Sequence, residues 1–267
     1  MTLKFAVQEN LIPGDNLIQK WDMIRAIGYQ GIELRGSAGM STRLPELTAA
    51  AGAGVVMPSI CVMADRFIGD FDATRRAVAL AAMKELCDVA GEIGAKGVVT
   101  PAAYGMHSNR LPPFTAPRTP DDDQTILIDM LGKLGTHAAT RGVTVWLEPL
   151  NRYEDHMVNT LAQGASLCRA VGLPSVKLMA DLFHMNIEEA DIGASLRAAG
   201  DLVGHVHLAD NHRVEPGLGH TDFAAAFKAL ADLGFDGYAA IECRFEQAPD
   251  VALQSAFAAL NRAMKQG

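Results

Sequence analysis

The feature that most constrains the fold is a short apolar run followed by a longer segment with helical spacing, repeated eight times. The apolar runs lie at 3–7, 31–35, 55–61, 97–100, 143–148, 176–181, 203–208 and 238–242. Segments between them, such as 75–92 and 222–233, carry apolar residues three and four positions apart, as amphipathic helices do. Eight strand–helix units indicate a parallel sheet, and 267 residues suit its closure into a barrel. The sequence therefore predicts an α/β fold, with 1–267 forming a single (β/α)₈ TIM barrel domain.

One long segment departs from this rhythm. Residues 102–123 hold four of the twelve prolines and show no periodicity. We expect a long loop between the fourth strand and the fourth helix at about 102–123. A loop of this length after a barrel strand indicates a substrate loop or lid, while a surface excursion or an oligomer contact is the alternative.

Composition and charge narrow the classes of function. The formal net charge is −8, and nucleic-acid-binding proteins usually present a basic face, so we expect no nucleic acid partner. The N-terminal residues lack the apolar core of a signal peptide, and no apolar run approaches the ~18 residues of a membrane span. The four cysteines are scattered with no CxxC pair and no short spacing, which indicates reduced thiols and not a disulfide framework. We therefore expect a cytoplasmic enzyme without a membrane segment.

Polar residues lie at the ends of the later apolar runs, the positions at which barrel enzymes carry catalytic residues. Glu148, Asp181 and Glu242 end the fifth, sixth and eighth runs, and His207 lies near the end of the seventh. The carboxyl ends of barrel strands converge on one mouth, and several buried carboxylates there require a positive partner. Three carboxylates and one imidazole favour a single divalent ion, Mn²⁺ first, with Mg²⁺ or Co²⁺ as alternatives.

A second group of polar residues follows the first along the chain. Glu154 lies six positions after Glu148, His184 three after Asp181, and Arg213 six after His207. On the loops that follow the strands, these three side chains would lie beside the metal and bind substrate hydroxyl groups. A solvated loop charge is the alternative for each one alone.

Four segments resemble a known family. LEPLNRYE, ADLFHMNIEE, HVHLADNHRVEPGLGHTDF and YAAIECR are similar to motifs of the sugar isomerase/epimerase superfamily of xylose isomerase-like TIM barrels, nearest its D-tagatose 3-epimerase group of ketose 3-epimerases. The resemblance covers roughly 143–244. It implies the same four metal ligands and substrate contacts at Glu154, His184 and Arg213. It also implies that Glu148 and Glu242 are the catalytic acid/base pair, and that the chain forms a homodimer or homotetramer.

The residues and the resemblance together predict a metal-dependent isomerase for a small-molecule sugar. A metal-bound enediolate would form by proton abstraction from a carbon next to a ketone, and C3 epimerisation of a ketose is the first expectation. Aldose–ketose, hydroxypyruvate or inosose isomerisation and a dehydration are alternatives that use the same metal site. Other classes are a non-catalytic sugar-binding protein and an abasic-site DNA endonuclease. The endonuclease has a trinuclear zinc cluster with histidines on early strands, where this chain has Cys61 and Thr100.

Overall fold

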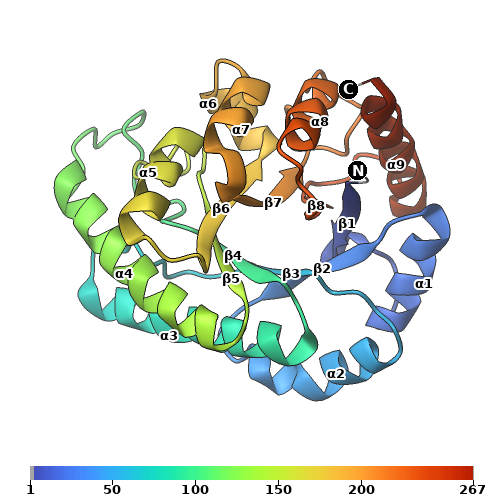
Figure 1. The fold of residues 1–267 in the computed structure, drawn as a ribbon, viewed down its shortest axis with the longest axis horizontal. Helices are drawn as coiled ribbons and strands as arrows, with labels where there is room; N and C mark the ends of the chain where they lie inside the picture. Colours follow the sequence, from blue (N-terminus) through green and yellow to red (C-terminus); the bar gives the residue numbers. More distant parts are fainter. Residues whose placement is uncertain (1–2, 267) are drawn as a thin grey trace.

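Eight parallel strands form a closed barrel in chain order, as the sequence predicts (Figure 1). The computed structural model describes residues 3–266. The first strand pairs with the last, so the sheet has no free edge. The strands are β1 (Lys4–Gln8), β2 (Gly31–Gly36), β3 (Ser59–Val62), β4 (Gly97–Pro101), β5 (Thr144–Glu148), β6 (Val176–Asp181), β7 (Val203–Leu208) and β8 (Tyr238–Ile241).

Helices form an outer ring around the strands (Figure 1). They are α1 (Leu17–Ile27), α2 (Leu44–Gly52), α3 (Ala73–Ile93), α4 (Pro120–Thr140), α5 (Leu161–Val171), α6 (Leu182–Glu188), α7 (Ile192–Ala199), α8 (Phe223–Asp232) and α9 (Pro249–Gln266), with short 3₁₀ turns η1 (Glu9–Leu11), η2 (Met40–Arg43) and η3 (Gly200–Leu202). In α8 the buried residues include Phe223, Phe227 and Leu230, which recur on one helical face. Within residues 3–266, no helix has both the length and the apolar character needed to cross a membrane.

Local signals set the helix ends. The Asp222 carboxylate accepts a hydrogen bond of 3.0 Å from the Ala225 amide and caps α8, as the sequence suggests. Thr119 caps α4 in the same way through the Asp122 amide, and Pro120 occupies the first turn, where its missing amide hydrogen costs nothing. The loop after β4 therefore runs over 102–119. The expected boundary of 123 was wrong, because residues 120–123 already belong to α4.

Six strands differ from the expected ranges, most of them by a single residue at one end, and the third and eighth bear on the site. The third strand was expected over 55–61 but forms over 59–62. Pro58 has no amide hydrogen to donate to a sheet ladder, so regular pairing begins after it. The eighth strand ends at Ile241, one residue before Glu242, although the Glu242 amide still donates to the Leu208 carbonyl at 3.1 Å.

A small apolar cluster of Cys61, Val99, Trp146 and Met179 packs as a unit separate from the main core. The Trp146 ring stacks on the His205 ring, with centroids 4.7 Å apart and planes inclined by 12°. Gly204 lies against the same indole. A Cβ atom at that position would come within 2.3 Å of Trp146 Nε1, so only glycine leaves room for the tryptophan.

We therefore expect Gly204→Ala to lower the free energy of unfolding by ~1–3 kcal/mol, because the added methyl group must displace a packed indole. Urea titration followed by circular dichroism measures the change. Gly132→Ala is the matched control. A Cβ there meets nothing within 4 Å, so alanine inside α4 should add about 0.5–1 kcal/mol. Equal stability of Gly204→Ala and the wild type would contradict this packing argument.

Candidate metal centre and active site

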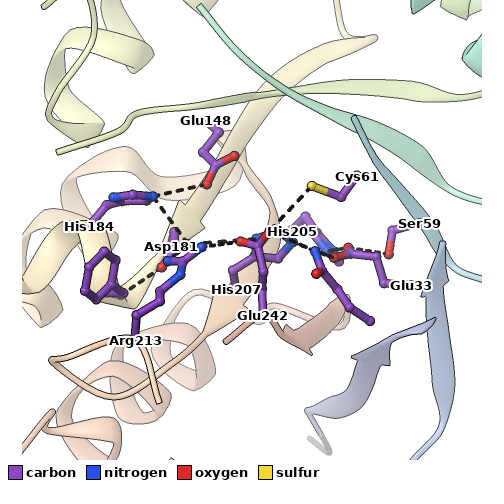
Figure 2. A network of polar contacts seen from close by, with 12 residues as sticks. Glu33, Ser59, Cys61, Glu148, Asp181, His184, His205, His207, Arg213 and Glu242 are labelled. Atoms are coloured by element: carbon purple, nitrogen blue, oxygen red, sulfur yellow. Dashed lines mark hydrogen bonds and ion pairs between the residues drawn. The ribbon is translucent and has the colours of Figure 1, made fainter. Parts of the chain in front are cut away.

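The four predicted metal ligands converge at the carboxyl ends of neighbouring strands (Figure 2). Glu148, Asp181, His207 and Glu242 each offer one donor atom, and these atoms all lie within 4.8 Å of one another. Sheet register explains part of this meeting, since Asp181 on β6 pairs directly with His207 on β7. The structure thus assembles the oxygen-rich set that the strand ends predict.

The donor atoms are oriented as a cation site requires. His207 Nδ1 lies 2.9 Å from Glu242 Oε2 and 3.9 Å from Asp181 Oδ2, so this nitrogen faces the carboxylates. Asp181 Oδ1 accepts a hydrogen bond of 2.8 Å from the Phe183 amide and caps α6, which leaves Oδ2 for the cluster. Three of the four side chains are buried, and Glu242 is 21% exposed. Buried carboxylates at this density need positive charge, so the residues fit a divalent ion.

The surroundings shift the pKa values of the two glutamates in opposite directions. Burial, and then the nearby Glu242 carboxylate, raise the pKa of Glu148 well above its usual range. Burial alone would also raise the pKa of Glu242, but His207 and Arg213 outweigh it and hold that pKa below its usual range.

Arg213 reaches directly into this cluster. Its Nη1 donates to Asp181 Oδ2 at 2.6 Å, its Nη2 contacts Glu242 Oε2, and its guanidinium lies 4.7 Å from the centre of the Phe183 ring. Among residues 3–266 it is the only non-glycine residue with positive φ, at 62°. Such a backbone costs of order 1–3 kcal/mol and is concentrated at functional sites. The local fold therefore holds Arg213 in a strained backbone conformation, from which its guanidinium group reaches the carboxylates.

His184, in the first turn of α6, points into the same site. The Asn151 amide donates to its Nδ1 at 3.2 Å, so a neutral ring carries its proton on Nε2. Burial lowers the pKa of His184, which keeps the ring neutral. Nε2 lies 3.7 Å from Glu148 Oε1 and 4.0 Å from Glu154 Oε2. His184 is thus a fixed donor toward the cavity.

A cavity of about 400 Å³ joins these groups. Its charged and imidazole lining side chains are Glu148, Glu154, His184, Arg213 and Glu242. The rest of its lining includes Cys61, Met63, Phe67, Tyr104, Leu150 and Phe183. All three predicted substrate-binding residues therefore line the same cavity as the predicted catalytic pair. A larger cavity of about 700 Å³ lies between the loop before α4 and α5, but none of the metal-capable residues lines it.

The start of the loop after β4 belongs to the mouth of this cavity. Tyr104 lines it, and the Gly105 amide donates to the Glu154 carbonyl at 2.8 Å, which joins the loop to the segment after β5. Glu154 itself is 34% exposed at the rim. This position favours the substrate-loop interpretation for residues 104–105.

Sequence reasoning missed a second polar group that lies beneath the metal-capable cluster. Glu33 on β2 is completely buried and contacts His205, His207, Ser59 and Gln8. A single glutamate inside an otherwise apolar strand run was the available signal. Strand-end reasoning passed over it because Glu33 lies in the middle of its strand.

Comparison with known proteins finds the family that the sequence resembles. Residues 21–263 match the family described as xylose isomerase-like TIM barrel. A 3-dehydro-D-guloside 4-epimerase of Escherichia coli K12 is 39% identical over 243 residues, which cover 91% of this chain and 92% of that protein. An L-ribulose 3-epimerase of Mesorhizobium japonicum is 44% identical over 105 residues, 39% of this chain and 35% of the other. The crystal structure of 3-keto-D-glucoside 4-epimerase from E. coli in its apo form superimposes with a TM-score of 0.93 at 38% identity, covering 98% of this chain and all of the other.

Proposed function

Because the chain belongs to the xylose isomerase-like TIM barrel family, and its relatives include keto-sugar epimerases, we propose that it is a metal-dependent keto-sugar epimerase. The observation that carries this proposal is the shared cavity. Glu148 and Glu242 line it beside a neutral histidine and an arginine, and both glutamates also belong to the metal-capable donor set. The reaction would invert a carbon next to a ketone.

The donor set of Glu148, Asp181, His207 and Glu242 would hold the cation, Mn²⁺ in the first place and Mg²⁺ or Co²⁺ as alternatives. A divalent ion bound there supplies Lewis-acid polarisation of the ketone and thereby acidifies the neighbouring C–H bond. Asp181 and His207 would act as ligands only, because the Phe183 amide bonds to Asp181 Oδ1 and Glu33 lies 2.8 Å from His207 Nε2.

Glu148 and Glu242 would carry the proton. Inversion requires a base on one face of the carbon and an acid on the other, and both carboxyl groups line the same cavity. Which glutamate acts as base depends on which epimer is bound. For the reverse reaction the two exchange roles.

The remaining polar side chains would bind and orient the sugar. The Nε2–H of His184 and the guanidinium of Arg213 would donate to the oxygen that gains negative charge, where preorganised donors stabilise the transition state. Glu154, at the rim, would accept a hydrogen bond from a hydroxyl group farther from the reacting carbon.

A relative that matches along almost the whole chain supports a first candidate for the substrate class. That protein is a 3-dehydro-D-guloside 4-epimerase, so a glycoside with a ketone at C3 that is inverted at C4 is our first candidate. The second is a free ketose inverted at C3, which the local match to an L-ribulose 3-epimerase favours. Both substrates present the same reacting unit, a ketone next to a carbon that bears a hydroxyl group.

Proton NMR in deuterium oxide tests the proposal. The Mn²⁺-loaded protein should convert a methyl 3-keto-hexoside to its C4 epimer with deuterium entering at C4, and chelation before recording removes the paramagnetic ion. D-tagatose, D-fructose, L-ribulose, inosose and hydroxypyruvate complete the panel. Inversion of a ketose at C3, at a higher kcat/KM than that of the glycoside, would select the second candidate. Failure of every compound to exchange a proton would reject epimerisation.

A further inference from the structure

Glu33 has no role in the proposed chemistry, yet it lies at the centre of a buried polar network (Figure 2). Its Oε2 accepts a hydrogen bond of 2.7 Å from the Ser59 hydroxyl and lies 2.7 Å from His205 Nε2. Its Oε1 lies 2.8 Å from His207 Nε2 and accepts a hydrogen bond of 3.2 Å from Gln8 Nε2. A carboxylate with no exposed surface requires such partners, and none of these is Lys or Arg.

The contact with His207 determines what that imidazole can do. His207 Nδ1 faces Glu242 and Asp181, so it is the nitrogen available to a metal ion. Nε2, on the opposite side of the ring, lies 2.8 Å from Glu33 Oε1, although it is not aligned for a hydrogen bond within residues 3–266. A carboxylate beside the second nitrogen keeps the proton there and leaves the first nitrogen free to coordinate.

The same carboxylate also reaches the catalytic pair. Gln8 Nε2 bridges Glu33 Oε1 and Glu242 Oε1, at 3.2 Å and 2.9 Å. Figure 2 shows His207 and Glu242 between Asp181 on one side and Glu33 on the other. Glu33 therefore contacts one metal ligand directly and a second through one amide group.

His205 and Trp146 hold Glu33 in place. His205 is buried, lies 2.7 Å from Glu33, and stacks on Trp146. The stack fixes the plane of the imidazole, which in turn fixes the carboxylate oxygen that it contacts. The network is thus anchored to strands on both sides of the barrel.

We infer that Glu33 is a positioning residue of the metal centre, which fixes the proton of His207 on Nε2 and orients Glu242 through Gln8. This inference rests on the metal site of the proposed function. It assigns to β1, β2 and β3 a direct part in a site whose ligands all come from strands β5 to β7 and the residue after β8.

The test is the Mn²⁺ affinity of Glu33→Gln, measured by competition with a fluorescent chelator. Loss of a carboxylate behind a ligand histidine weakens metal binding by roughly 10–100-fold, and this is the expected result. Glu215→Gln is the matched control, since Glu215 is equally buried but bonds to the amides of Glu246 and Gln247. Its Mn²⁺ affinity should equal that of the wild type.

Ser59→Ala keeps the inference testable if Glu33→Gln does not fold. It removes one hydrogen bond to Glu33 and should weaken Mn²⁺ binding by about fivefold. Long-range ¹H–¹⁵N spectra of the Mg²⁺-loaded protein add a readout that loss of stability alone does not move. The Nε2 proton of His207 should resonate downfield in the wild type, where it faces a carboxylate, and should move upfield in Glu33→Gln.

The outcomes separate the two proposals. A wild type that binds no Mn²⁺ rejects the metal site and the proposed function with it. Tight binding by the wild type with unchanged affinity and unchanged His207 spectra in Glu33→Gln rejects only the positioning role. Glu33, His205 and His207 also lie close enough to hold an ion themselves. A second Mn²⁺ per wild-type chain that Glu33→Gln loses would overturn positioning in favour of ligation.

Discussion

Glu148→Gln and Glu242→Gln should each lower turnover by ~10²–10⁴-fold, the range that a positioned acid or base contributes. An amide can neither accept nor deliver the transferred proton, and inversion needs both groups. Proton NMR in deuterium oxide measures epimer formation and deuterium incorporation together. Epimer formation should be lost in both variants. Each variant should keep deuterium exchange only for the epimer whose proton the remaining glutamate removes.

Metal content must be measured alongside, since both glutamates also belong to the donor set. Atomic emission on each purified variant shows whether the ion is retained. A variant that keeps its ion and loses turnover supports the acid/base role. Turnover and exchange at wild-type rates in either variant would eliminate the scheme of two glutamates.

Removal of the metal should have an effect of similar size. The cation supplies several kcal/mol of transition-state stabilisation, and each 1.36 kcal/mol is a factor of ten, so activity should fall by ~10³-fold or more. The experiment is dialysis against a chelator, followed by an assay before and after Mn²⁺ is returned. The same dialysis with the chelator saturated by Mn²⁺ is the control.

Mg²⁺ and Co²⁺ tested in the same way establish which ions support the reaction. Recovery with each one measures how strictly the site selects its metal, because oxygen-rich donor sets accept several hard ions. Full activity in a protein that retains less than about 0.01 ion per chain would show that the donor set has another purpose.

The barrel and the donor set could be predicted because both follow from a regular property of the chain. Eight strand–helix units close one sheet, and the last residue of each parallel strand lies at one mouth. Glu148, Asp181 and His207 could be found by position alone. Glu242 could be found as well, although it lies one residue beyond its strand, because its amide remains bonded to β7.

The Glu33 network could not be predicted in the same way. Whether a residue in the middle of a strand points into the barrel, and at what depth, depends on the stagger between strands. The sequence does not state that stagger. Pro58 illustrates the difficulty, because β3 begins only after it, at Ser59, the residue that pairs with Glu33. The direction of the Arg213 side chain depends on a positive φ angle, which the neighbouring residues in the sequence do not indicate.

The contact between Gln8 and Glu242 has a consequence for the order of folding. The two residues are 234 positions apart, and they meet only because β1 pairs with β8. Contacts at such separation carry a large loop-closure cost and form slowly. An intermediate with β1 detached would already contain all four metal donors, yet Glu242 would lack the amide that orients it. The hydrogen bond that orients Glu242 therefore requires a closed ring.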